Sequence, residues 1–177
     1  MKYLFESERH GFRKWRESDV SRFTNMNSDL EVMRYFPQLL SREESINLIN
    51  RIQSHFEKWN FGLWAVEEKD SENFIGFIGL YYADFQSSFT PCVEIGWRLD
   101  SRFWGRGYAT EGAKLCLQKG FEEFNLNEIY SFTSILNTKS ENVMIKIGMQ
   151  KVMDFEHPNL EKDHPLCKHV LYRILYD

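Results

Sequence analysis

The sequence predicts a single α+β domain in which helices flank a mixed sheet. Strand-like and helix-like segments alternate throughout residues 1–177, and a glycine-bearing turn links a strand at 93–99 to a helix at 107–124. No repeat, low-complexity tract or flexible linker divides the chain. A chain of 177 residues is long enough to bury one substantial core.

The N-terminal half is predicted to hold three strands and two helices. A strand at 11–15 precedes a short helix that ends near 25, with N-cap candidates at 17–19. Ser41 and Glu44 have the spacing of a capping box, and the helix behind them carries an apolar face at three- and four-residue steps. Segments 61–67 and 74–82 form a hairpin around a polar turn.

The C-terminal half is predicted to add four strands and two helices. After the strand at 93–99 and the helix at 107–124 come a strand at 128–135 and a short helix that ends at Gly148. Two late strands follow at 151–155 and 170–176, the second with alternating apolar residues. The order β-α-α-β-β-β-α-β-α-β-β favours one mixed sheet covered by helices.

Composition excludes several classes of protein. A formal net charge of −4 gives no support for general nucleic-acid binding. No apolar run approaches the length of a membrane span, and the N-terminus lacks a signal-peptide core. The three cysteines are too widely spaced for a disulfide framework or a paired zinc motif. We therefore expect a cytoplasmic protein with no nucleic-acid or membrane partner.

The turn Arg102-x-x-Gly105-x-Gly107 is the most informative segment. A strand, a glycine-bearing turn and a helix N-terminus form an arrangement suited to phosphate, because the first helical N–H groups lack intrahelical acceptors. Gly105 and Gly107 permit close approach to the backbone, while Arg102 and Arg106 add positive charge. The Lys-Ser/Thr of a P-loop and the third glycine of a dinucleotide fingerprint are absent. The alternative is a tight connection without a ligand.

This turn resembles the Gln/Arg-x-x-Gly-x-Gly/Ala motif of the GCN5-related N-acetyltransferases (GNAT), and residues 104–111 resemble the RimJ/RimL branch. Asn137-x-x-Ser140-x-x-Val143 with Gly148-Met149 resembles a second segment of that family. The resemblance spans nearly the whole chain and is most specific over 91–149. It implies a twisted, mostly antiparallel sheet of six to seven strands with about four helices. The sheet would splay between strands four and five, here 93–99 and 128–135.

The resemblance also implies acetyl-CoA as cosubstrate and no metal. The pyrophosphate would lie on the turn and helix start, at Arg102, Gly105, Arg106, Gly107, Tyr108 and Ala109. The pantetheine arm would follow the backbone of Trp97, Arg98 and Leu99, near Asn137 and Asn142. The alternative for Asn137 is that it only caps the following helix.

Glu94 is the first candidate for the base that accepts the amine proton. Strand alternation places it opposite the apolar face of 93–99, and the family often uses a glutamate on this strand. The alternative is a structural partner for Arg98 on the same face. The family's acid tyrosine is replaced by Met144, so that position cannot supply a proton. His157 is a second proton-carrier candidate; it and the neighbouring His164, Cys167 and His169 are too loosely spaced to favour zinc.

In the family the loop after the first helix covers the acceptor site, so the resemblance implies that Arg34, Tyr35 and Phe36 lie on the acceptor side; His157 is a further substrate-binding candidate. The sequence thus predicts an N-acetyltransferase that transfers acetyl directly to a primary amine, either a protein N-terminus or a small molecule. A non-catalytic acyl-CoA sensor is the alternative. The acceptor, the general acid, the choice between monomer and homodimer, and whether Glu94 acts directly or through water stay open.

Overall fold

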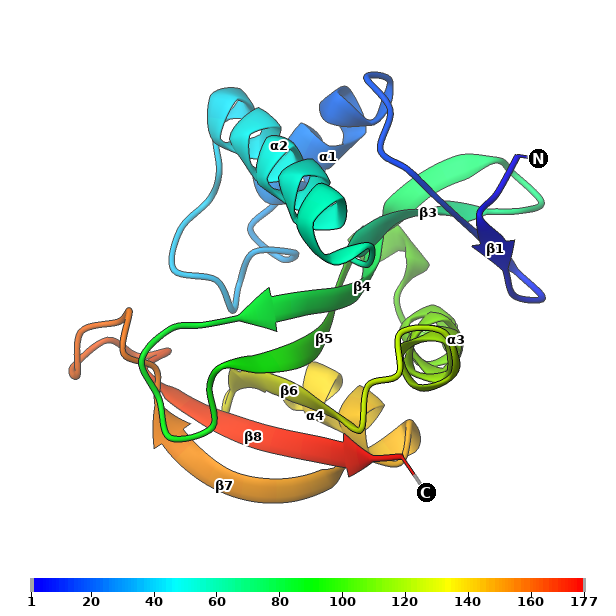
Figure 1. The fold of residues 1–177 in the computed structure, drawn as a ribbon. Coiled ribbons are helices and arrows are strands. Elements are labelled where there is room, and N and C mark those ends of the chain that lie inside the picture. Colours follow the sequence, from blue (N-terminus) through cyan, green and yellow to red (C-terminus); the bar gives the residue numbers. More distant parts are fainter. Residues whose placement is uncertain (1, 177) are drawn as a thin grey trace.

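A computed structural model describes residues 2–176 and contains one eight-stranded sheet with helices on both faces (Figure 1). The strands follow the order β1-β2-β3-β4-β5-β6-β8-β7, and all neighbours are antiparallel except β5 and β6. The elements are β1 (Phe5–Glu6), β2 (His10–Arg13), α1 (Asp19–Asn27), α2 (Arg42–Trp59), β3 (Leu63–Glu68), β4 (Asn73–Ala83), β5 (Cys92–Leu99), a 3₁₀ turn (Ser101–Phe103), α3 (Tyr108–Glu122), β6 (Glu128–Ser134), α4 (Thr138–Lys146), β7 (Gln150–Glu156) and β8 (Lys168–Leu175).

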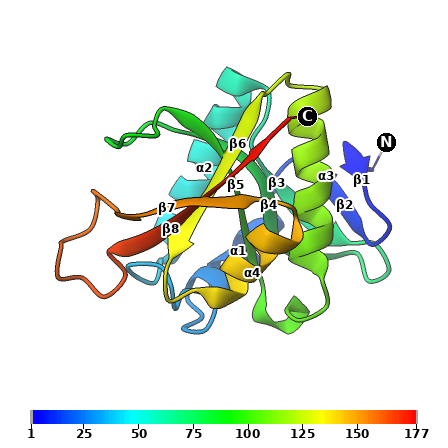
Figure 2. The ribbon, with the colours of Figure 1, turned by 90° about the horizontal axis from the view of Figure 1, so that it is seen from below.

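Helices α1 and α2 lie on one face of the sheet, and α3 and α4 lie on the other (Figures 1 and 2). Each face has its own apolar core. Ile78, Leu80 and Ile95 pack against α3, whereas Phe74 and Phe77 pack against α1 and α2. Because successive side chains of a strand point to opposite faces, β3 and β4 each contribute to both cores.

The predicted elements are all present, and the mixed sheet with four α-helices is confirmed. The capping box of α2 forms as predicted, since Ser41 Oγ accepts from the Glu44 N–H and the Glu44 carboxylate accepts from the Ser41 N–H. The sheet has eight strands rather than the predicted six to seven, because the short β1 was not expected. Its two residues pair with Gly11 and Phe12, and two residues are too few for a periodic pattern.

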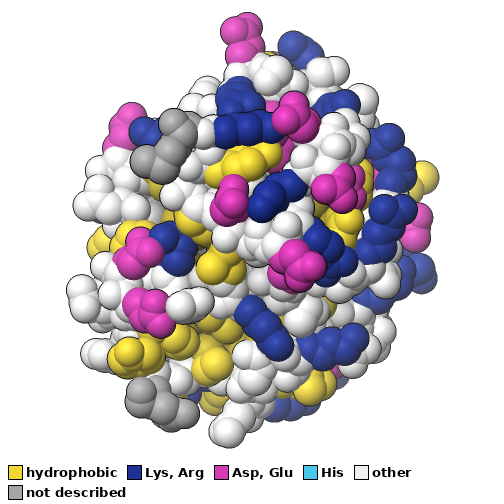
Figure 3. Space-filling view, turned by 90° about the vertical axis from the view of Figure 1, so that its right-hand side faces the viewer, with side chains coloured by type: hydrophobic (Ala, Val, Ile, Leu, Met, Phe, Trp, Pro, Cys, Tyr) yellow, Lys and Arg dark blue, Asp and Glu magenta, His cyan; other side chains and the backbone are white. Residues whose placement is uncertain are grey.

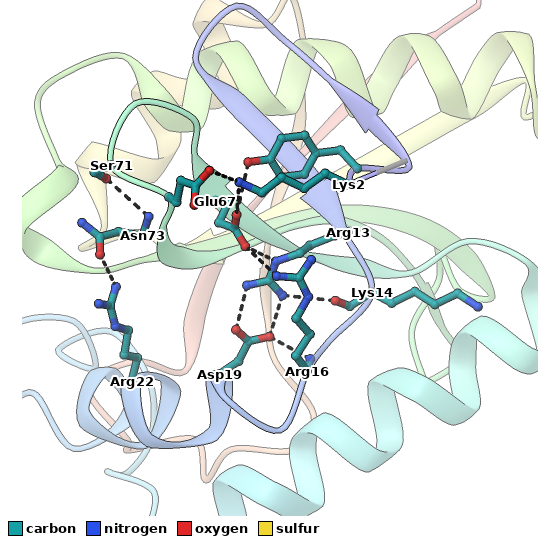
Figure 4. A network of polar contacts seen from close by, with 11 residues as sticks. Lys2, Arg13, Lys14, Arg16, Asp19, Arg22, Glu67, Ser71 and Asn73 are labelled. Carbon is teal, nitrogen blue, oxygen red and sulfur yellow. Dashed lines mark hydrogen bonds and ion pairs between the residues drawn. The ribbon is translucent and has the colours of Figure 1, made fainter.

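An ion-pair network fixes β2, α1 and β3 to one another (Figure 4). The Arg13 guanidinium donates 2.7 Å bonds to both oxygens of Asp19 and also pairs with Glu67. Arg16 and Lys2 reach the same Glu67 carboxylate from the surface. Arg13, Asp19 and Glu67 are buried, so each charge depends on its partners for the hydration that it has lost.

The face that carries β1 and α3 mixes acidic and basic side chains, with basic groups gathered toward one edge (Figure 3).

Within residues 2–176, the helices are too short or too polar to cross a bilayer.

Candidate active site

The glycine turn leads directly into the N-terminus of α3, as predicted. Gly105 and Gly107 have φ values of 75° and 78°, the left-handed region in which a Cβ is strained. Gly107 is the N-cap residue and has no side chain to satisfy the first N–H groups of the helix. A Cβ built on Gly105 would meet nothing within 4 Å, so space lies open beside the turn. The geometry therefore fits a phosphate group.

The charged residues of the turn are placed differently from one another. Arg106 is exposed, with its guanidinium 5.8 Å from the Phe103 ring. Arg102 is also exposed but already forms a two-bond ion pair with Asp100, at 2.6 and 2.9 Å. Arg106 is thus the more available phosphate partner of the two.

The Tyr108 side chain donates to Glu68 on β3, and its ring stacks with that of Phe103 at 6.2 Å between centroids. The backbone N–H groups of Tyr108, Ala109 and Thr110 have no intrahelical acceptor, because the first helical bond runs from the Glu111 N–H to the Gly107 carbonyl.

A clamp that sequence reasoning missed holds the turn in place. Glu111, in the first turn of α3, accepts bonds from Ser7 Oγ at 2.7 Å, from the Arg9 N–H at 3.0 Å and from Arg9 Nε at 2.6 Å. Arg9 Nη1 also donates to the Arg106 carbonyl at 2.9 Å. These contacts hold the pKa of Glu111 below its usual value despite partial burial. The hairpin of β1 and β2 therefore supports the turn from behind.

Strands β5 and β6 meet only briefly. Glu94 and Tyr130 form their one register pair within residues 2–176, and Ser131 Oγ donates to the Ile95 carbonyl at 3.0 Å. Beyond this point β5 keeps ladder pairs with β4 alone, so its edge toward β6 opens. An extended amide chain could add to such an edge.

The predicted pantetheine contacts lie on this open edge of β5. The Leu99 carbonyl already accepts a 2.8 Å bond from the Trp104 indole. The Arg98 carbonyl points toward Gly76 on β4, whereas the Ile95 carbonyl, two residues before Trp97, faces β6. Trp97 therefore remains as the residue whose backbone is best placed beside the opening.

Asn137 caps α4, a role that is compatible with a contact to the cofactor. Its Oδ1 accepts from the Ser140 N–H at 3.3 Å, and its amide donates to Thr133 Oγ1 and Ser140 Oγ at 3.0 and 3.1 Å. Asn142 is exposed on α4. Lys139, which the sequence did not single out, lies 4.6 Å above the Trp104 ring and brings a further positive charge toward the glycine turn.

Glu94 lies at the point where β5 and β6 separate. It is half-buried, and loss of hydration raises the pKa of its carboxyl to about 8. No hydrogen bond or ion pair from the residues between 2 and 176 offsets this effect. The structural-partner alternative is wrong, because Arg98 is four residues further along the strand, about 13 Å away. Its guanidinium bonds to Asn27 instead.

Met144, at the position of the family's acid tyrosine, is 1% exposed and packs in the α3-side core. A thioether carries no proton, so the leaving group receives none from this position.

The acceptor-side candidates are only partly brought together. Phe36 lies against the Arg98 guanidinium, at 4.0 Å from its ring centroid. Arg34 is exposed, and its guanidinium lies 5.6 Å from the centroid of the neighbouring Tyr35 ring. His157 belongs to an aromatic cluster, 4.7 Å from Phe85 and 5.0 Å from His169 between ring centroids.

The histidines do not form a metal centre in the part of the chain that the structure describes. No three His, Cys, Asp or Glu side chains between residues 2 and 176 are grouped closely enough to hold an ion. Burial lowers the pKa of both His157 and His169, which favours their neutral forms.

Comparisons with known proteins agree with this geometry. Residues 9–150 match the family model described as an acetyltransferase (GNAT) domain. Two curated Bacillus subtilis relatives are the uncharacterized protein YkkB, 30% identical over 69% of this chain and 70% of its own, and the uncharacterized N-acetyltransferase YnaD, 29% identical over 78% of each.

Solved structures share the fold over almost the whole chain. A GNAT acetyltransferase from Bacillus anthracis has a TM-score of 0.79 and 26% identity, with 96% of each chain covered. A coenzyme A complex of RimL, a ribosomal L7/L12 N-acetyltransferase, has a TM-score of 0.79 at 14% identity over 97% of this chain and 96% of its own. Spermidine N-acetyltransferase from Vibrio cholerae, with CoA and spermine, has a TM-score of 0.76 at 19% identity over 96% of each. The chain belongs to the GNAT acetyltransferase family.

Proposed function

We propose that this protein transfers the acetyl group of acetyl-CoA directly to a primary amine. The observation that carries the proposal is the position of Glu94, a carboxyl without a partner at the point where β5 opens toward β6. GNAT acetyltransferases use acetyl-CoA, which supplies an activated thioester. The open space beside Gly105 and the uncapped start of α3 support binding of its pyrophosphate.

Glu94 would accept the proton of the acceptor amine, directly or through one water molecule. An alkylammonium has a pKa of about 10, so the amine is mostly protonated at neutral pH and cannot attack. A base whose own pKa is about 8 is well matched to this task, because it is basic enough to accept the proton and partly ionised at working pH. Backbone N–H groups on the open edge of β5 would stabilise the oxyanion.

The proton for the leaving thiolate has no assigned donor. Since Met144 is buried and carries no proton, the thiolate would leave unassisted or receive its proton from water.

Methionine at position 144 favours a second candidate function, a non-catalytic sensor of acyl-CoA that keeps the cofactor site. A sensor has no need of a base, whereas an enzyme does. The two candidates therefore differ in what they predict for Glu94.

The decisive experiment measures thiol release from acetyl-CoA with a panel of primary amines. We expect turnover by the unmodified protein and a loss of about 10²–10⁴-fold in Glu94→Gln, with acetyl-CoA affinity unchanged. Glu128→Gln is a matched control, because Glu128 is exposed at the start of β6 and lies outside the opening. Binding of acetyl-CoA without turnover of any amine would favour the sensor.

A further inference from the structure

The protein buries two arginines on the same side of the sheet, and their surroundings differ. Arg13 is 4% exposed and is paired with two carboxylates, Asp19 and Glu67. Arg98 is 9% exposed, and no ion pair reaches it from the residues between 2 and 176. A buried guanidinium without a counter-charge is unfavourable, so Arg98 requires an explanation that Arg13 does not.

The contacts of Arg98 leave most of its hydrogen-bonding capacity unused. Nη1 donates to Asn27 Oδ1 on α1 at 2.7 Å, and the guanidinium lies 4.0 Å from the Phe36 ring and 5.5 Å from the Phe77 ring. Nε is buried and finds no acceptor within residues 2–176. Loss of hydration lowers the pKa of Arg98 to about 10, which still leaves it charged at neutral pH.

Arg98 shares one face of β5 with the candidate base. Glu94, Gly96 and Arg98 alternate onto the face covered by α1 and α2, as the contact of Arg98 with Asn27 shows. A Cβ placed on Gly96 would meet nothing within 4 Å, so the strand between the two charged side chains is uncovered. A molecule lying over Gly96 would have the Glu94 carboxyl at one end and the Arg98 guanidinium at the other.

We propose that Arg98 recognises a carboxylate of the acceptor, so that the natural acceptor is a primary amine that also carries a carboxylate group. This inference rests on the proposed function and names its substrate class. A guanidinium binds a carboxylate through two parallel hydrogen bonds, and the unused Nε is one of the donors that such a bond needs.

The spacing along β5 defines which amino acids fit. Four residues of strand separate the Cα atoms of Glu94 and Arg98 by about 13 Å. The amine and the carboxylate of the acceptor should therefore be separated by several bonds, as in an ω-amino acid, rather than by one carbon as in glycine. Polyamines, which carry only positive charge, would be repelled by Arg98.

The first test needs no variant. ω-Amino acids of two to eight carbons are each compared with the carboxamide of the same skeleton, by the rate of thiol release from acetyl-CoA. For skeletons of intermediate length, we expect kcat/KM to be about 10–100-fold higher for the ω-amino acid than for its carboxamide. The difference should come from a lower KM for the ω-amino acid. Equal or better use of the carboxamides would overturn the proposal.

The second test separates recognition from structural support. Arg98→Gln should abolish the preference for carboxylate over carboxamide, whereas Arg98→Lys should restore part of it and Arg51→Gln, at an exposed arginine of α2, should leave it intact. If Arg98 had only a structural role, Arg98→Gln would instead lower the melting temperature and reduce the rate of acetylation of both members of each pair equally. If Arg98→Gln does not fold, the comparison of unmodified protein with Arg98→Lys decides.

Failure of the proposed function is recognised separately. If no amine is acetylated, calorimetric titration of the CoA-saturated protein with the same pairs still tests the role of Arg98. Tighter binding of the ω-amino acids than of their carboxamides would support it, and equal binding would overturn it.

Discussion

Replacing Glu94 with glutamine should make the protein more stable while it destroys activity. In the unfolded chain this carboxyl ionises near 4.5, whereas burial holds its pKa at about 8 in the folded protein. Between these values the unfolded state binds fewer protons, so the stability of the unmodified protein falls as the pH rises. Glutamine has nearly the same shape and no such dependence. The two proteins should be equally stable below pH 4.5 and differ most above pH 8.

The size of this effect follows from the shift in pKa. Each pH unit corresponds to about 1.4 kcal/mol, which sets a ceiling of about 5 kcal/mol for a rise from 4.5 to about 8. Glu94 is only half-buried, and water reduces this figure to about 1–3 kcal/mol. For a chain of this length the gain corresponds to a melting temperature about 2–12 °C higher.

The assay is urea unfolding of both proteins at pH 5, 6.5, 8 and 9. Glu111→Gln is the matched control and should behave in the opposite way. Its carboxyl accepts from Ser7 and Arg9, and its pKa is lowered, so it contributes stability above the unfolded value that is lost as the pH falls. If Glu94→Gln were less stable than the unmodified protein at pH 8, the carboxylate would have a stabilising partner, and the base assignment would lose its physical basis.

Three further substitutions test other parts of the structure. Gly105→Ala places a side chain at a φ of 75° and should cost about 1 kcal/mol in urea unfolding and weaken acetyl-CoA binding; unchanged affinity would remove the turn from the site. Arg9→Ala breaks the clamp to Glu111 and should raise the KM for acetyl-CoA about tenfold with little change in kcat, whereas an equal fall in kcat would contradict a role confined to the turn. Arg13→Met removes the buried partner that Asp19 and Glu67 share and should cost about 3–5 kcal/mol of unfolding free energy; a loss below about 1 kcal/mol would show that the network is hydrated.

The elements of the fold follow from local patterns in the sequence. The capping box of α2, the alternation along β5 and the glycine turn before α3 each depend on residues a few positions apart, so the sequence alone predicts them. The two-residue β1 was missed because it exists only through its pairing with β2.

The candidate site was only partly predictable, because local patterns do not reveal contacts between distant parts of the chain. Position on β5 was enough to select Glu94, but the contacts that support the site join distant parts of the chain. Arg9 and Glu111 are 102 residues apart, and Asn27 and Arg98 are 71 apart. The pairing of Glu94 with Arg98 was a wrong alternative because sharing a face does not imply contact when three strand residues intervene.

Calorimetric titration with acetyl-CoA tests the proposed cofactor site most directly, and the Arg106→Glu/Gly107→Glu double variant is its control. We expect micromolar binding by the unmodified protein, and no measurable binding by the variant, because its two carboxylates would repel the pyrophosphate at the start of α3. No binding by the unmodified protein, or equal binding by both, would contradict the assignment of this turn as the pyrophosphate site.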